Sequence, residues 1–302
     1  MTRIGGSRRS PYRRAWWSVL PSIAALVLVC IPAPAANAAW SLPCGGKRPL
    51  RPGGAGFYKC TFDDEFNGTA VDGTKWYPVT TAVTGFHSGA ECFMFSPNNI
   101  AESGGVLSLT VRKEAAPFTC KTPTGSYTTQ YTAGGLNTLG RFAQAYGRFE
   151  IRAKFPAATV AGLQSALWLV STSNKYGSWP TTGEIDVAEW YSQFPDRAIP
   201  YVHYAPVGGV DPNATNNFCL ITANQFHTYV LQWTTSWISI TYDGRTCIYD
   251  SWNPAPPLVK PAPFDQPFLI ALTQALGVNT NAVTGATQLP ATTQIDYVRV
   301  WS

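Results

Sequence analysis

The stretch "GRFEIRAKF", residues 147–155, alternates charged and apolar residues at every position. An extended chain points successive side chains to opposite faces of a sheet. The two sets therefore separate by face, with Arg148, Glu150, Arg152 and Lys154 on one side and Phe149, Ile151, Ala153 and Phe155 on the other. This period of two predicts a β-strand with one buried face.

Further segments of the same kind follow along the chain, separated by Gly, Pro, Asn and Asp, and no long stretch has helical periodicity. Asp243-Gly244, between two such segments, is a strong hairpin signal. The other predicted strands are 106–111, 165–170, 184–190, 200–207, 227–233, 268–275 and 293–301. Ten or more short strands without a linker predict an all-β fold, an antiparallel β-sandwich of the jelly-roll type.

The first 38 residues have the features of a signal peptide. Five arginines precede the apolar run 15–31, and Ala36-Asn37-Ala38 offers a cleavage site after Ala38. A retained signal anchor is the alternative, but the run is short for a membrane span and contains Pro21. A lipoprotein signal at Cys30 is a second alternative, and the export route stays open. We expect a secreted protein with no membrane contact after cleavage.

The basic character of the chain belongs to this leader. The chain has 22 basic and 17 acidic residues, and five of the basic ones and none of the acidic ones precede residue 39. Residues 39–302 therefore carry 17 of each sign and no net charge. Charge thus gives no indication of a nucleic-acid partner, and we expect none.

Six cysteines remain after the leader, and an even number in an exported protein predicts disulfides. Sequence neighbours are the expected pairs, although 15 connectivities exist. Residues 39–58 are rich in Pro and Gly and are expected to form an N-terminal extension. Residues 59–302 are expected to form one catalytic domain, working as a monomer.

The stretch "WPTTGEIDVAEW", 179–190, concentrates three carboxylates in one apolar strand. In a regular strand Glu184 and Asp186 share a face and Glu189 points to the other. A β-bulge at about Val187–Ala188 would add one residue and return Glu189 to the first face. The three acids would then project into one groove, with apolar neighbours packed beneath them.

Two carboxylates flanking a groove are the groups that hydrolyse glycosidic bonds. At about 5–5.5 Å apart, one attacks the sugar while the other protonates the leaving oxygen. The third acid would raise the pKa values of its neighbours and hold the nucleophile. The alternative is an exposed strand face whose acids are solvated or paired with Arg148 or Arg152.

Several motifs in order resemble those of glycoside hydrolase family 16, in particular its laminarinase-like β-glucanases. The acids match the family motif E-x-D-x-x-E as Glu184-Ile185-Asp186-Val187-Ala188-Glu189. The other matching stretches are "FDDEFNGTAVDGTKW", "NNIAESGGVLSLTV", "YTAGGLNT", "YGRFEIRAKFP", "ALWL", "WPTTGEID" and "TQIDYVRVW". The resemblance covers the chain from about Phe62 and implies a concanavalin A-like jelly roll with a substrate groove on its concave sheet.

By position, the resemblance implies that Glu184 is the nucleophile, Asp186 the supporting carboxylate and Glu189 the general acid/base. Trp168 and Trp179 match aromatic residues of the groove. His203 and Arg148 are further expected substrate-binding residues; the alternatives are a core histidine and an arginine paired with Glu150. No cofactor is expected for catalysis.

Some members of the family bind a structural calcium on the convex face. The corresponding positions here are Asp296 and the carbonyl near Gly105, although Asp296 could instead take part only in a hydrogen bond. The chain also departs from the family, because "LTQALGVNTNAVTG" lacks the tryptophan that laminarinases have there, and "ECFMFSPNN" is unusual. These departures affect the choice of substrate and leave the acids intact.

The expected function is a retaining endo-β-glycanase that cuts internal β-1,3 bonds of a polysaccharide, with β-glucan as its partner. The longer motif, with its extra residue Ala188, points to β-1,3-glucanases and galactanases within the family. A β-1,3-1,4-glucanase, a galactanase and a transglycosylase are alternatives with the same machinery. A non-catalytic lectin on the same scaffold is an alternative of another class.

Overall fold

The computed structural model describes residues 42–302. The predicted signal peptide, 1–38, and the first residues of the predicted extension lie outside the described residues. Within the described part, no helix is long and apolar enough to cross a membrane. The only α-helix there is α1 (Thr81–Thr84), and four short 3-10 turns lie in loops.

The described part of the chain contains fifteen strands. The first seven are β1 (Cys60–Asp64), β2 (Tyr77–Pro78), β3 (Cys92–Phe93), β4 (Ile100–Ser103), β5 (Val106–Thr122), β6 (Gly125–Asn137) and β7 (Gly147–Lys154). The others are β8 (Leu163–Ser171), β9 (Glu184–Tyr191), β10 (Ile199–His203), β11 (His227–Trp233), β12 (Ile238–Tyr242), β13 (Arg245–Asp250), β14 (Phe268–Leu276) and β15 (Ala291–Trp301). The prediction of a many-stranded all-β domain is confirmed.

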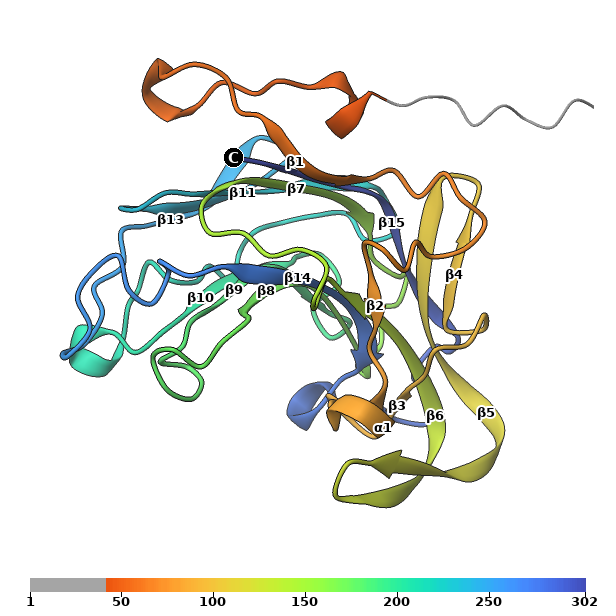
Figure 1. Ribbon diagram of the computed structural model, residues 1–302. Helices are drawn as coiled ribbons and strands as arrows, with labels where there is room; N and C mark the ends of the chain where they lie inside the picture. Colours follow the sequence, from red (N-terminus) through yellow and green to blue (C-terminus); the bar gives the residue numbers. More distant parts are fainter. Residues whose placement is uncertain (1–41) are drawn as a thin grey trace, which may run out of the picture. The chain divides into compact units, whose positions relative to one another are not determined.

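The strands form two layers, which Figure 1 shows one above the other. One layer has the order β10-β9-β8-β14-β6, and the other has the order β5-β15-β7-β11-β12-β13. The long hairpin of β5 and β6 joins them, because β5 pairs with β15 near its start and with β6 beyond that, while β6 continues onto β14. The pairs within the layers are antiparallel, as the predicted jelly-roll sandwich requires.

The hydrophobic core fills the space between the layers. The strand that opened the sequence analysis, β7, buries Phe149, Ile151 and Ala153, while its charged residues face outward. Across the core, Phe155 stacks on Trp190 of β9 with ring centroids 6.0 Å apart. Packing in the core therefore fixes the position of β9 from its buried side, and a rigid strand is a suitable support for a functional site.

The predicted hairpin and disulfides are present. Asp243 and Gly244 both have positive φ, at 49° and 79°, as the tight turn between β12 and β13 requires. The cysteines pair as sequence neighbours: Cys44–Cys60, Cys92–Cys120 and Cys219–Cys247. The first of these fastens the extension, whose Cys44 and Tyr58 pack against Trp301 of β15.

Candidate active site

The β-bulge predicted in the acidic strand is present in β9. On β8, Trp168 pairs with Asp186 and Leu167 pairs with Ala188, so Val187 has no partner. The pairing with β10 shifts at the same place. Glu189 therefore returns to the face of Asp186, as the uneven spacing of the acids requires.

The opposite face of β9 is wholly apolar. Ile185, Val187, Ala188 and Trp190 are completely buried in the core. Val187 and Ala188 are consecutive and both point inward, which a regular strand does not allow. The extra residue thus keeps the core filled and the acids together on the outer face of the layer.

The three acids line one cavity of about 340 Å³. Its floor comes from β8, β9 and β14, and the loop before β3 covers one side. The lining residues are Phe86, Ser88, Gln164, Ala166, Trp168, Trp179, Glu184, Asp186, Glu189, Thr273 and Ala275. Trp168 and Trp179 therefore lie where the sequence placed them, and Trp179 presents an indole that is 58% exposed.

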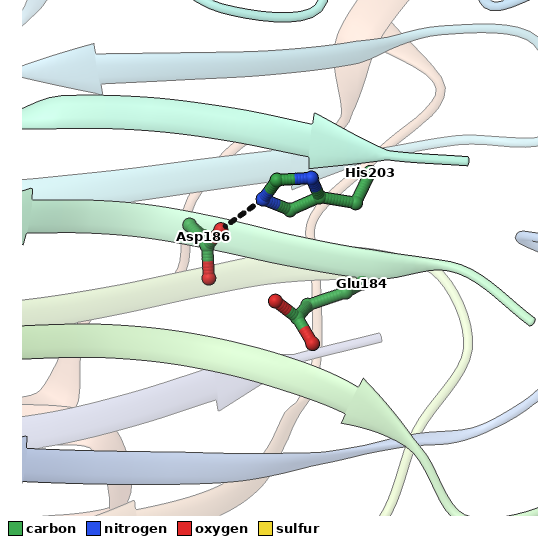
Figure 2. A group of neighbouring side chains, drawn as sticks. All are labelled: Glu184, Asp186 and His203. Atoms are coloured by element: carbon green, nitrogen blue, oxygen red, sulfur yellow. Dashed lines mark ion pairs between the residues drawn. The ribbon is translucent and has the colours of Figure 1, made fainter. Parts of the chain in front are cut away.

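His203 joins the acids from β10. Its Nε2 lies 2.8 Å from Oδ2 of Asp186, and Figure 2 shows the ring pointing to that carboxylate with Glu184 beside it. Ligand-type atoms of Glu184, Asp186 and His203 all lie within 4.8 Å of one another. The ring is stacked on Tyr201 with centroids 3.8 Å apart, which fixes its orientation. His203 thus lies beside the acids and contacts Asp186 directly.

Burial and mutual repulsion raise the pKa values of two of the acids. Burial and then the charge of Asp186 raise the pKa of Glu184 to about 8. Burial and then Glu189 raise the pKa of Asp186 well above its usual range, and burial lowers the pKa of His203. Carboxyls so close together share protons. A proton kept on Asp186 removes its repulsion of Glu184 and so favours the carboxylate form that a nucleophile needs.

Glu189 is held by two neighbours that the sequence analysis missed. Its Oε1 accepts hydrogen bonds of 2.8 Å from Gln164 Nε2 and from the Tyr191 hydroxyl. Ser88 in turn donates to Gln164 Oε1. Both bonds to Glu189 end on one oxygen, which leaves Oε2 for proton transfer. Tyr191 could have been predicted, because residues two apart in a strand share a face. Gln164 could be predicted only by knowing how β8 pairs with β9.

The structure does not place Arg148, an expected substrate-binding residue, beside the acids. Arg148 lies on β7 in the other layer and is absent from the cavity lining. Its Nη2 is 2.5 Å from Glu150 Oε2, and Lys47 of the extension bonds to the same carboxylate. The outward face of β7 is thus neutralised locally, as the alternative interpretation held.

The expected calcium ligands do not form a matching donor set. The Asp296 carboxylate bonds to Nη1 of Arg152 at 2.5 Å, whereas Ca²⁺ takes six to eight oxygen ligands. Among residues 42–302, the only group of three acidic, His or Cys side chains close enough to hold a metal ion together is Glu184, Asp186 and His203. A guanidinium occupies the place of a cation beside Asp296, which agrees with the simpler hydrogen-bond alternative.

The comparisons with known proteins agree with this geometry. The model of "Glycosyl hydrolases family 16" matches residues 87–297, which include all three acids. The chain belongs to glycosyl hydrolase family 16. It is 30% identical over 258 residues to a glucan endo-1,3-beta-glucosidase A1 of Niallia circulans, covering 80% of this chain and 37% of that protein. The chain therefore spans about a third of that relative's length.

Two further similar proteins extend the comparison. A beta-glucanase of Rhodothermus marinus is 32% identical over 216 residues, covering 67% of this chain and 70% of the relative. Among solved structures, a non-specific endo-beta-1,3(4)-glucanase crystallised with 1,3-beta-D-cellotriosyl-glucose superimposes with a TM-score of 0.68 at 27% identity. That superposition covers 81% of this chain and 95% of the other. The family-16 jelly roll is therefore the fold of this chain.

Proposed function

We propose that this chain is an exported, retaining endo-β-glycanase that hydrolyses internal β-1,3-glucosidic bonds of glucans. The observation that supports this proposal most is the bulged strand β9, which points three carboxylates into one cavity. A sandwich fold alone hosts many functions. Burial and repulsion raise the pKa values of Glu184 and Asp186, which has a cost to stability, and catalysis gives a reason for that cost.

In the proposed reaction, the Glu184 carboxylate attacks the anomeric carbon of the sugar. Glu189 donates its proton to the glycosidic oxygen, which leaves as a hydroxyl group on the released part of the polysaccharide. Glu189, now a carboxylate, removes a proton from water, and the water oxygen displaces Glu184 from the anomeric carbon. Two inversions at that carbon release a product with the original β configuration, and both residues return to their starting protonation states.

Asp186 and His203 position the nucleophile in this scheme. Asp186 is only 3% exposed and bonds to His203. With Nε2–H of His203 donating to Asp186 Oδ2, a proton on Asp186 Oδ1 is free to face Glu184, which stabilises the ionised nucleophile. Trp168 and Trp179 offer aromatic faces to the apolar C–H faces of sugar rings.

Export is proposed from the leader and the cysteines together. Residues 1–38 have the charge and apolar pattern of a signal peptide. Three disulfides among the described residues suit an oxidising compartment outside the cytoplasm. A secreted enzyme would meet β-glucan as an external polymer.

A panel of polysaccharides tests the proposed substrate. Laminarin and curdlan should yield short β-1,3-linked oligosaccharides, with larger products appearing first because the cuts are internal. Lichenan, xyloglucan, agar and carrageenan distinguish the other members of the family, and long products from an added sugar acceptor would indicate a transglycosylase. Binding without any product on every polymer would favour the lectin alternative. Absence of activity on all β-1,3-linked glucans would reject the substrate proposed here.

A further inference from the structure

A second cavity, of about 270 Å³, lies where β10 and β13 end. It shares no residue with the catalytic cavity. Most of its lining comes from the loop that follows β10 and from the residues around the end of β13. Two carboxylates, those of Asp211 and Asp250, face this space together with other oxygen-bearing side chains.

Asp250 is the unusual member of this group. The residue is only 1% exposed, and its Oδ2 has no hydrogen-bond partner. No ion pair within residues 42–302 involves Asp250. A buried carboxylate without a partner is costly unless it is protonated or binds a cation. Within the described residues, Asp250 therefore has no basic partner, and its carboxyl neighbour is Asp211.

Asp211 is oriented by its own loop. Its Oδ1 accepts a hydrogen bond of 2.9 Å from the backbone N–H of Asn213, and its Oδ2 accepts one from the Tyr204 hydroxyl. The same hydroxyl accepts the backbone N–H of Asn253 at 3.1 Å, which links the two segments that line the cavity. These bonds hold the Asp211 carboxylate in place without neutralising its charge.

Lys260, the basic group that acts on Asp250, does not bond to it. Lys260 donates from Nζ to the carbonyl of Ser251 at 2.9 Å and lies 4.6 Å over the ring of Trp252. Burial, the charge of Asp211 and a hydrogen bond with the Asp211 carboxyl raise the pKa of Asp250 to about 7, in spite of the opposing effect of Lys260. Two carboxyl groups thus lie together in the second cavity, and no basic side chain in the described part of the chain bonds to Asp250 to compensate its negative charge.

We propose that Asp211 and Asp250 bind a divalent cation, with Ca²⁺ as the ion that their chemistry fits. All the donors around the space are oxygens and none is a histidine or a cysteine, which favours Ca²⁺ over zinc and other transition metals. The volume leaves room for the water ligands that complete a calcium shell. The cation would replace the proton that the pair otherwise retains.

The position of this site gives the cation a structural effect. Tyr204 directly follows His203, the residue that contacts Asp186 in the catalytic cavity. A cation that joins Asp211 to Asp250 would tie the loop after β10 to the end of β13. Calcium should therefore stabilise the fold and hold the end of β10, without taking part in the reaction itself.

Thermal unfolding and calorimetry of the full chain test the proposal. After treatment with EDTA, saturating Ca²⁺ should raise the Tm by about 5–10 °C, and titration should show one site with release of protons near neutral pH. Asp250→Asn should remove both the Tm shift and the heat of binding. Asp211→Asn should lower the affinity for Ca²⁺ at least about 10-fold. Asp250→Asn without calcium should unfold no more easily than the wild type, because the repulsion between two carboxylates is gone.

Asp296→Asn is the matched control, since it makes the same change at the carboxylate paired with Arg152. This variant should keep the calcium response in full. The proposal is overturned if the wild type shows neither a Tm shift nor binding heat with Ca²⁺. It is equally overturned if Asp296→Asn loses the response while Asp211→Asn and Asp250→Asn retain it.

Discussion

Glu184→Gln should lower kcat on a β-1,3-glucan by about 10⁴-fold or more. The amide has nearly the shape of the carboxylate but cannot attack the anomeric carbon. The polysaccharide should still bind, because Trp168 and Trp179 are unchanged. Steady-state kinetics together with binding of the intact polymer measure both effects. Glu114→Gln, the same change on β5 outside the cavity lining, should leave kcat within about 2-fold of the wild type.

The same variant should also change how stability depends on pH. The pKa of Glu184 is raised from 4.5 to about 8 in the folded protein. Between these values the folded state holds more protons than the unfolded state, so the free energy of unfolding falls as pH rises. This stabilisation is fully present below about pH 4.5 and is lost through about pH 8.

Glu184→Gln lacks this ionisation. At pH 9 its Tm should exceed that of the wild type by roughly 5–10 °C, and the difference should shrink towards pH 5. Part of the slope should remain, because the pKa of Asp186 is also raised. Wild-type turnover in Glu184→Gln, or an unchanged pH dependence of its Tm, would contradict the assignment of Glu184.

Glu189→Ala should separate substrates by their leaving groups. A sugar hydroxyl is a poor leaving group and needs a proton, so kcat/KM on the polysaccharide should fall by about 10³-fold. An aryl glycoside with an acidic phenol needs little protonation to leave, and the formation of its glycosyl-enzyme should fall by no more than about 10-fold. Pre-steady-state release of the phenol measures that step.

Tyr191→Phe is the control for this second prediction. It removes one hydrogen bond to Glu189 Oε1 while Gln164 keeps the other, so both substrates should lose about 10-fold or less. Equal losses of about 10³-fold on the polysaccharide and on the aryl glycoside in Glu189→Ala would show that Glu189 is not the acid.

Much of the fold could be predicted from local sequence patterns. The alternation in 147–155, the hairpin at Asp243-Gly244 and the bulge at Val187–Ala188 each depend on the period of a strand, which the chain itself reveals. The long hairpin of β5 and β6 could not be foreseen in this way. Its bridging of the two layers depends on which strands lie beside it, and this is decided by packing far along the chain.

Some residues of the site could likewise be predicted from the sequence, and others could not. The three acids, Trp168, Trp179 and His203 were identified from spacing and motifs, and they meet in the structure. Gln164 reaches Glu189 only because β8 pairs with β9 in one register. Arg148 was misplaced because alternation separates the two faces of a strand but does not say which one meets the substrate. Asp211 and Asp250 gave no sequence signal, since they lie 39 positions apart.

The stereochemistry of the first product tests most directly whether the acids of β9 act as nucleophile and acid/base. Proton NMR can follow the anomeric signals while laminarin is cleaved, before mutarotation mixes the two forms. Attack by Glu184 and then by water should release the β anomer first, with the α anomer growing in only as mutarotation proceeds. Initial release of the α anomer would show a single displacement by water and would contradict a covalent intermediate on Glu184.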